Sequence, residues 1–286
     1  MKELNDRVAV VTGAGSGIGR ALAERFAAEG MRVVLADVDE ARARETETLL
    51  AARGARTLVV QTDVQEGAAV EALAARTLAA FGAVHVVCNN AGVAGLGRPS
   101  WEQPLESWQQ VLGVNLWGVI HGIRTFVPIM LQQGSEGHIV NTASMAGLVS
   151  LPLLAAMAGL VSLPLLAPYH ATKHAVVTIS ESLHMELAMS GAPVRVSVLC
   201  PGFVRTNIGA ESLQDPRSEA EAAMQEAFRR LIAEGLDPAT VAERVVEAIR
   251  AEQFWVFSHP ELVVAVQQRA EAIVARRNPE AAPLPT

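Results

Sequence analysis

Residues 7 to 19, RVAVVTGAGSGIG, decide the fold of this chain. The first six residues are mostly apolar and β-branched, which predicts a short buried strand. Four of the next seven are glycines, and the positions that follow show helical spacing of apolar side chains up to Gly30. A glycine-rich turn between a strand and a helix predicts a phosphate-binding site, although an ordinary tight turn has the same local pattern.

The same order of strand and helix continues along the chain and predicts an α/β fold. Because the strands are continuously apolar, we expect a Rossmann-type, doubly wound parallel sheet of about seven strands with helices on both faces. Its ligand crevice would lie at the carboxyl ends of the strands. After the strand at 7–12, strands are expected at 32–37, 56–61, 84–88, 138–142, 194–199 and 254–257, and helices at 20–29, 40–53, 67–81, 105–131, 169–190, 239–251 and 261–277.

No linker rich in glycine, serine or proline divides the chain, so we expect residues 1–278 to form one dinucleotide-binding and catalytic domain. Residues 279–286 are expected to be a disordered tail. The helix at 105–131 is expected to break near Pro128, and residues 207–235 are expected to be irregular.

Composition argues against several classes of function. The net charge is −7 and no basic cluster is present, which disfavours a nucleic-acid-binding protein. The two cysteines lack metal-ligand spacing and the charged N-terminus runs directly into a strand, so a cytoplasmic protein without a signal peptide is expected. His170 and His174 lie one helical turn apart, but Tyr169 and Lys173 explain that stretch better, and no metal site is predicted.

Asp37 ends the second strand, eighteen residues after Gly19. A carboxylate there can accept hydrogen bonds from both hydroxyls of an adenosine ribose and would repel a 2′-phosphate. No arginine or lysine lies in the glycine-rich turn or in the two positions after Asp37, so NAD(H) is expected rather than NADP(H). Asp37 could instead cap the next helix, although Asp39 is better placed to do so.

Tyr169 is the only tyrosine of the chain, and Lys173 is one of only two lysines. Four positions apart, the two residues share one face of a predicted helix. A neighbouring ammonium favours the phenolate and lowers the tyrosine pKa from its usual value of about 10, so the pair can serve as an acid/base for a hydroxyl or carbonyl group. A YxxxK pattern also arises by chance on exposed helices, but both residues are rare in this chain.

Together these motifs resemble, in order, those of the short-chain dehydrogenase/reductase (SDR) family. The resemblance covers about residues 5 to 260, and the motifs are specific in combination. It rests on Thr12–Gly19, Asp37, Asp63–Val64, Asn89–Gly92, Asn115, Ser144, Tyr169–Lys173 and Pro201–Thr206.

The resemblance implies a role for each matching residue. Tyr169 would donate and accept the proton, Lys173 would lower the tyrosine pKa and hold the nicotinamide ribose, and Ser144 would hydrogen-bond the substrate oxygen. Asn115 would anchor a water that links Lys173 to solvent. The cofactor would lie against Gly13, Ser16, Gly17, Ile18, Gly19, Asp37, Asp63, Val64, Asn90, Ala91, Gly92, Tyr169, Lys173, Pro201, Gly202, Val204 and Thr206.

The family transfers hydride between a nicotinamide and a secondary alcohol or ketone, so the resemblance implies an oxidoreductase. We expect a small apolar substrate, and residues 207–235 would close over it. Family members commonly form dimers or tetramers through the long helix and the tyrosine-bearing helix, which implies a homodimer or homotetramer. The alternative is an SDR-fold protein with a displaced serine that binds NAD and acts only as a binding or scaffold protein.

One departure from the family pattern concerns Ser144. Residues 145–155 and 157–167 both read MAGLVSLPLLA, so twelve extra residues separate Ser144 from Tyr169. The family pattern would place the serine at position 156, which is alanine, and using that position would put a proline inside a central strand. We therefore expect Ser144 to keep its place and the extra residues to loop out, as a cap over the pocket, a subunit contact or a neutral insertion. A transmembrane helix over 145–167 is rejected because both of its ends must reach one site.

Overall fold

The computed structural model of the protein has a parallel sheet at its centre, as the sequence predicts. The structure describes residues 1–95, 97–148, 166–208 and 219–278. Within these residues the strand order is β3-β2-β1-β4-β5-β6-β7, so the direction of winding reverses between β1 and β4. The strands are β1 Val8–Thr12, β2 Arg32–Asp37, β3 Thr57–Gln61, β4 Val86–Asn89, β5 Gly137–Thr142, β6 Val194–Cys200 and β7 Trp255–Phe257.

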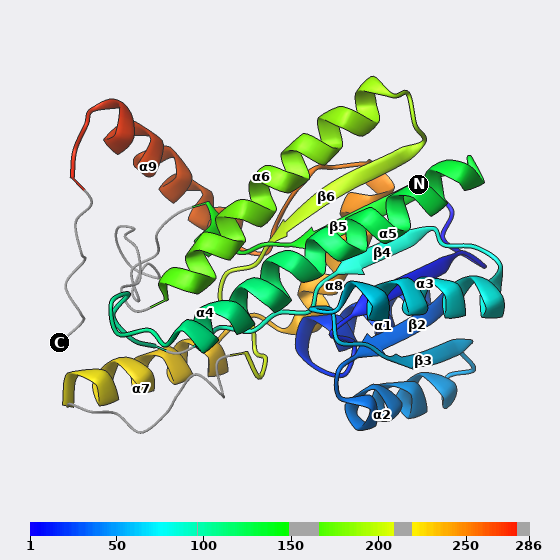
Figure 1. Cartoon of the computed structure of the whole chain (residues 1–286), viewed down its shortest axis with the longest axis horizontal. Helices are drawn as coiled ribbons and strands as arrows, with labels where there is room; N and C mark the ends of the chain where they lie inside the picture. The colour runs from blue at the N-terminus through cyan, green and yellow to red at the C-terminus, as the bar shows by residue number, and fades with distance from the viewer. Residues whose placement is uncertain (96, 149–165, 209–218, 279–286) are drawn as a thin grey trace.

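Helices cover both faces of this sheet (Figure 1). One face is covered by α1 Gly17–Ala28, α2 Glu40–Ala51 and α8 Pro238–Ala251. The opposite face is covered by α3 Gly67–Phe81, α4 Leu105–Leu112, α5 Gly118–Gln133 and α6 Ala167–Met189.

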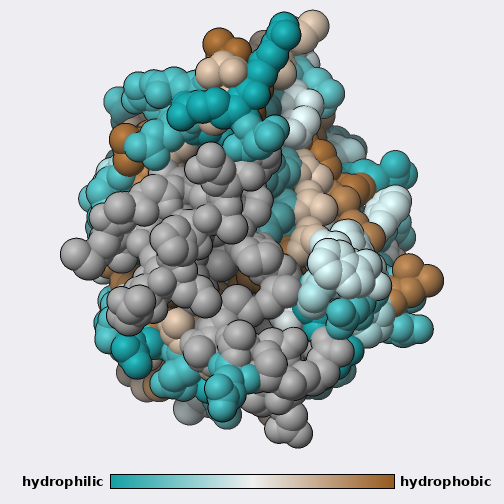
Figure 2. Space-filling model, turned by 90° about the vertical axis from the view of Figure 1, so that its left-hand side faces the viewer, coloured by the Kyte–Doolittle hydropathy of each residue, from teal (hydrophilic) through white to brown (hydrophobic). Residues whose placement is uncertain are grey.

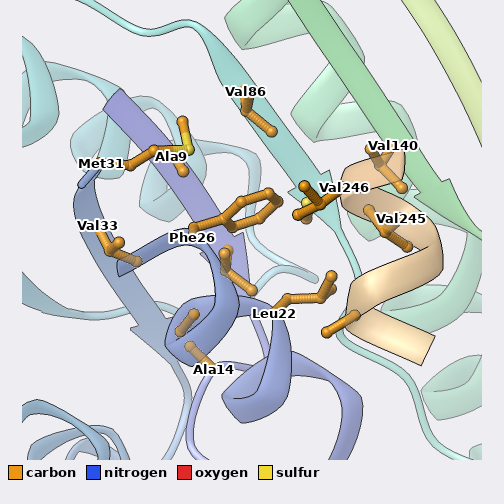
Figure 3. Close-up of a cluster of buried hydrophobic side chains, with 14 of the residues drawn as sticks. Ala9, Ala14, Leu22, Phe26, Met31, Val33, Val86, Val140, Val245 and Val246 are labelled. Carbon is orange, nitrogen blue, oxygen red and sulfur yellow. The ribbon is translucent and has the colours of Figure 1, made fainter. Parts of the chain in front are cut away.

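The side chains of β1 point alternately to the two faces of the sheet, so the strand contributes to both hydrophobic cores. Ala9 belongs to the cluster beneath α1 and α8, whereas Val8 and Val10 belong to the cluster beneath α3, α5 and α6. Figure 3 shows the ring of Phe26, from α1, between Ala9 and the α8 residue Val246. Full burial of such a side chain stabilises a fold by about 1.5–3 kcal/mol, so this contact fixes α1, and with it the glycine-rich turn, on the sheet.

The long helix is irregular at a different place from the one predicted. α5 continues through Pro128 to Gln133, and a π-helical segment, Gly113–Trp117, joins α4 to α5. The prediction of a break near Pro128 is wrong, because Phe126 and Met130 are buried on either side of the proline and hold the helix on the sheet. The π-helical segment instead carries Asn115, whose side chain is fully buried.

The combined helix Leu105–Gln133 is long and apolar enough, by length and composition, to cross a membrane. In the described structure it packs against α3, α6 and β4, and it buries the polar side chain of Asn115. We therefore interpret it as a core helix of the α/β fold.

Two helices lie past the carboxyl ends of the strands, at the left of Figure 1. α7, Glu219–Ala233, occupies half of the segment predicted to be irregular, and that prediction is wrong there because its alanines and glutamates favour a helix. A 3₁₀ helix, Pro260–Val263, leads into α9, Val264–Val274. Figure 2 views this end, and the described surface at the top of that view is mostly hydrophilic.

Some predictions fall outside the described residues. They concern the tail at 279–286 and the middle of the duplicated stretch, 149–165. The continuous sheet, with one core on each face, supports our proposal that residues 1–278 form a single domain.

We expect two buried histidines to make the fold sensitive to acid. Burial lowers the pKa of His138 to about 3 and that of His85 to about 4. Below about pH 6.5 the unfolded chain binds protons at both residues and the folded chain does not, so the free energy of unfolding falls as the pH drops towards 4. Above that pH both histidines are neutral in the folded and unfolded chain, so they no longer make the free energy of unfolding depend on pH. Urea denaturation between pH 7.5 and 5 measures this change.

His138→Gln is the matched control for this prediction. His138 Nε2 lies 2.7 Å from Ser197 Oγ, which itself donates to Gln253 O at 2.6 Å, so the ring nitrogen is the donor. A glutamine amide can make the same donation but does not titrate, so the stability of this variant should fall less steeply with acid. An equally steep fall would exclude His138 as a source of the effect.

Candidate active site

The glycine-rich turn joins the carboxyl end of β1 to the N-terminus of α1. Gly19 has no space for a side chain, because a Cβ atom there would lie 1.9 Å from the Gly13 carbonyl oxygen. Gly17 has a φ of +52°, in the left-handed region that favours glycine. The N-cap residue Ser16 makes no side-chain cap hydrogen bond, so the first N–H groups of α1 are available to an anion. The turn therefore fits the pyrophosphate of a dinucleotide.

Asp37 is held beside this turn by two backbone hydrogen bonds. Its Oδ2 accepts from Gly15 N at 2.8 Å, and its Oδ1 accepts from Asp39 N at 3.0 Å. Asp39, and not Asp37, caps α2, since its carboxylate accepts from the N–H groups of Ala41 and Arg42. The carboxylate of Asp37 thus lies where a ribose bound to the turn would place its hydroxyls.

Two arginines lie closer to the turn than their sequence positions indicate. Arg20 Nη2 donates to Gly15 O at 2.5 Å and pairs with Glu45 at 3.1 Å. The Cβ of Arg42 lies 2.7 Å from where a Gly15 Cβ would stand, and its guanidinium pairs with Asp39 at 3.2 Å. Sequence reasoning missed both, because their approach depends on the packing of α1 and α2 against β2.

The residues after β4 are tied to the end of β1. Thr12 Oγ1 accepts hydrogen bonds from Asn90 N at 2.9 Å and Ala91 N at 3.0 Å, and Asn90 Nδ2 donates to Thr12 O at 2.9 Å. These bonds place the predicted cofactor residues Asn90 and Ala91 at the reversal of strand order. Thr12 was not singled out, and nothing in the sequence distinguishes it from other threonines at strand ends.

Asp63 and Val64 follow β3 on the same edge of the sheet. Asp63 Oδ1 accepts from Gln65 N at 3.0 Å, which fixes the loop after the strand. Val64 is buried against α5, where a Cβ on Gly118 would come within 2.8 Å of its side chain. Both lie at carboxyl ends of strands, as the predicted adenine contacts should.

Tyr169 and Lys173 lie on the first turns of α6. Lys173 Nζ is 5.6 Å from the centre of the Tyr169 ring and donates to Thr142 O at 2.8 Å. Burial lowers the pKa of Lys173 to about 8. Burial also raises the pKa of Tyr169, while a hydrogen bond with Ser144 acts in the opposite direction. The pKa of Tyr169 is therefore raised and not lowered as predicted from Lys173, which leaves the side chain a neutral phenol at neutral pH, the form that donates a proton.

Ser144 lies beside Tyr169, two residues past the end of β5. Its hydroxyl is close enough to act on the pKa of Tyr169, and its Oγ accepts from Ala146 N at 3.1 Å and donates to Pro201 O at 3.4 Å. The structure thus brings the serine and the tyrosine together although twenty-five positions separate them.

The first copy of the repeat is anchored where it leaves Ser144. Its opening residues, Met145–Gly147, form a 3₁₀ helix against α6. His170 Nδ1 donates to Ala146 O at 3.1 Å, and a Cβ on Gly147 would lie 2.5 Å from Lys173 O. The following part of the duplicated stretch, residues 149–165, lies outside the described residues.

Asn115 is oriented by backbone and side-chain hydrogen bonds. Its Oδ1 accepts from Val93 N at 2.9 Å, and its Nδ2 donates to Val93 O at 2.9 Å and to Thr172 Oγ1 at 3.3 Å. A Cβ on Gly92 would lie 3.4 Å from Asn115 Oδ1 and 3.6 Å from Lys173 Nζ. Asn115 and Lys173 therefore meet at Gly92, as their predicted connection through one water requires.

The loop Pro201–Thr206 connects the catalytic side of the site with the glycine-rich turn. At one end Met145 N donates to Pro201 O at 2.9 Å. At the other end the Cγ2 of Thr206 lies 3.0 Å from where a Gly17 Cβ would stand, and Val204 is buried. The predicted nicotinamide loop therefore spans the distance between the predicted proton donor and the predicted phosphate cradle.

Tyr169 packs against a buried apolar cluster that contains Met145. Leu148, Leu262 and Val266 pack against the same cluster. Leu262 and Val266 belong to the 3₁₀ helix before α9 and to α9 itself. The C-terminal segment thus shares an apolar cluster with Tyr169.

Comparisons with known proteins agree with this arrangement. A family model described as short chain dehydrogenase matches residues 7–217. A CLA biosynthesis dehydrogenase/reductase of Lactiplantibacillus plantarum is 32% identical, with 98% of this chain and 97% of that protein covered. A 1-deoxy-11-beta-hydroxypentalenate dehydrogenase of Streptomyces exfoliatus is 38% identical, with 94% and 89% covered. The crystal structure of a Burkholderia phymatum short chain dehydrogenase/reductase in complex with NAD superposes with a TM-score of 0.90 at 43% identity, with both chains fully covered.

Proposed function

Because the chain belongs to the short-chain dehydrogenase/reductase family, we propose that it interconverts a secondary alcohol and a ketone by NAD(H)-dependent hydride transfer, with Tyr169 as general acid/base. One observation carries this proposal. Tyr169, Lys173 and Ser144 converge at the same edge of the sheet as the glycine-rich turn, despite the duplication between two of them.

The chain supplies position and a proton to this reaction. The nicotinamide, when bound, gives or takes the hydride. Ser144 Oγ would hold the substrate oxygen by a hydrogen bond, next to the Tyr169 hydroxyl. Tyr169 would then give its proton to that oxygen during reduction, or take one from the alcohol during oxidation. The buried Lys173 would face the nicotinamide ribose and, with Asn115, return the proton from solvent.

The proposal is tested by following NADH absorbance with a panel of ketones, with NADPH measured in parallel. Turnover of an apolar ketone would support the enzyme. Tight NADH binding without turnover of any panel member would support the alternative, a binding or scaffold protein. The proximity of the Ser144 hydroxyl to Tyr169 counts against that alternative, because the serine is not displaced from the tyrosine.

The preference for NAD(H) is supported by Asp37. Its carboxylate is fixed at the turn by Gly15 N, so a 2′-phosphate would meet a negative charge. Arg20 and Arg42, the cations near the turn, are each paired with a carboxylate, Glu45 and Asp39 respectively.

Asp37→Ala should shift the cofactor preference towards NADP(H). Without the carboxylate, a 2′-phosphate would no longer meet a like charge at position 37. We expect the ratio of kcat/KM for NADPH to kcat/KM for NADH to rise by at least about tenfold. Glu40→Ala is the matched control: it removes a carboxylate that pairs with Arg44 at the start of α2, and it leaves Asp37 and the Asp39–Arg42 pair in place. Equal ratios for the two variants would refute the role of Asp37.

An apolar substrate is supported by the side chains around Tyr169. Leu148, Leu262 and Val266 pack against the same apolar cluster as its ring, and all three are only partly buried. A small ketone or secondary alcohol with apolar substituents fits such a wall because it would remove apolar surface from water.

We also propose a cytoplasmic homodimer or homotetramer that assembles through the long helix and α6. Both helices expose large apolar side chains: Trp117 and Leu131 on the long helix, and Met185 and Met189 on α6. Apolar side chains exposed on neighbouring helices are typical of subunit contacts. Cys88 and Cys200 are free and buried, which agrees with a reducing compartment.

A further inference from the structure

Ser258 and His259, the two residues that follow β7, contact the loop Pro201–Thr206. Gly202 N donates to Ser258 Oγ at 2.9 Å, and Ser258 is 2% exposed. A Cβ on Gly202 would lie 2.7 Å from His259 Nδ1, so the ring of His259 packs directly against this glycine. The two contacts fix the backbone of Gly202 from two sides.

These contacts form a chain of hydrogen bonds with a defined direction. Ser258 Oγ lies 2.7 Å from His259 Nδ1. Ser258 Oγ accepts the Gly202 N–H, and among the described residues its own hydrogen has no acceptor other than Nδ1. We therefore assign Nδ1 as the acceptor and place the proton of the neutral ring on Nε2.

The pair is anchored in the scaffold and connected to the substrate side. Arg244 Nη1, from α8, donates to Phe257 O at 3.0 Å and to Ser258 O at 2.6 Å. On the other side, His259 is the N-cap residue of the 3₁₀ helix Pro260–Val263, whose Leu262 packs in the same cluster as the Tyr169 ring. Ser258 and His259 thus join the predicted nicotinamide loop to the segment that borders the catalytic tyrosine.

We propose that Ser258 and His259 are positioning residues: the chain from Gly202 N–H through Ser258 Oγ to His259 Nδ1 fixes the loop that covers the nicotinamide. This inference rests on the proposed function, because it takes Pro201–Thr206 as the nicotinamide loop. Neither side chain reacts. Their effect is to keep Gly202 in the place that bound cofactor requires.

The acceptor role depends on a neutral ring. Burial lowers the pKa of His259, Glu261 from the following 3₁₀ helix opposes this, and Arg244 from α8 acts in the same direction as burial. The ring is therefore neutral at pH 7 and becomes protonated only at a lower pH than an ordinary histidine. Protonation places a hydrogen on Nδ1 and removes the acceptor for Ser258.

The first test is the affinity for NADH, followed by its fluorescence on titration. Ser258→Ala and His259→Phe each break the chain, and we expect about tenfold weaker binding from either change. His259→Asn keeps an acceptor, the amide Oδ1, near the position of Nδ1, and should restore binding to within about twofold of the wild type. Melting curves by circular dichroism check that each variant is folded.

The second test is the pH profile of the same dissociation constant. For the wild type it should rise as the pH falls below 7 and the His259 ring becomes protonated, whereas for His259→Asn it should stay flat over the same range. The pH dependence distinguishes two roles of His259, as a hydrogen-bond acceptor and as a packing group. The smaller asparagine side chain would not restore lost packing. This second test does not need His259→Phe, so it can be carried out even if that variant does not fold.

The outcomes distinguish this inference from the proposed function. A wild type that does not bind NADH would overturn both. A wild type that binds NADH, with Ser258→Ala and His259→Phe binding equally well, would overturn the positioning role alone. Weaker binding that asparagine does not restore, or a profile that stays pH-dependent in His259→Asn, would overturn the acceptor role of the ring.

Discussion

Tyr169→Phe is expected to lower kcat by about 10²–10⁴-fold, because it removes the hydroxyl that exchanges the proton with the substrate oxygen. The phenylalanine ring can occupy the same place in the apolar cluster beside Leu148 and Leu262, so the fold and the NADH dissociation constant should change little. Steady-state rates with a ketone found by the panel measure the loss, and NADH fluorescence measures the retained binding.

His174→Gln is the control for this variant. His174 lies on the same helix and donates from Nδ1 to His170 O at 2.9 Å, and we assign it no part in the reaction. Its turnover should stay close to that of the wild type. If Tyr169→Phe retained turnover within a few-fold of the wild type, Tyr169 would not be the proton donor.

Ser144→Ala is expected to lower kcat by about 10²–10³-fold, the usual effect of removing one hydrogen-bond donor to the reacting oxygen. The serine is buried at the end of β5 and contacts Tyr169, so its loss should affect the reacting oxygen more than the cofactor. The signature is a fall in kcat with little change in the KM for NADH.

Ala156→Ser tests the other place that the family pattern allows for this serine. Position 156 lies thirteen residues before Tyr169, outside the described residues. Because Ser144 contacts Tyr169, we expect the double variant Ser144→Ala/Ala156→Ser to be as slow as Ser144→Ala alone. Restored turnover in the double variant would show that position 156, directly before the second copy of the repeat, can supply the serine.

Several features of the site were predictable from the sequence because they depend on neighbours along the chain. The turn before α1 was predictable from its glycines. Because Gly19 has no side chain, the Gly13 carbonyl can approach it closely. Tyr169 and Lys173 show as a pair because helical spacing places i and i+4 on one face. The order of strands and helices likewise followed from local runs of apolar residues, with errors only at Pro128 and within 207–235.

Other features depend on contacts between segments far apart in the sequence. The π-helical turn that buries Asn115 is set by packing between α4, α5 and α6. The approach of Arg42 to Gly15 and of His259 to Gly202 joins elements that no spacing rule connects. The raised pKa of Tyr169 depends on its burial, which a sequence pattern does not measure.

The sequence by itself determined the family pattern, the parallel sheet and the pairing of Tyr169 with Lys173, because glycine conformation, helical periodicity and strand composition are local properties. Only the tertiary structure decided that Ser144 reaches Tyr169 across the duplication, since β5 fixes the serine and α6 fixes the tyrosine regardless of the length of chain between them. It also decided that Tyr169 is a neutral phenol, because burial by distant segments removes the water that would stabilise the phenolate.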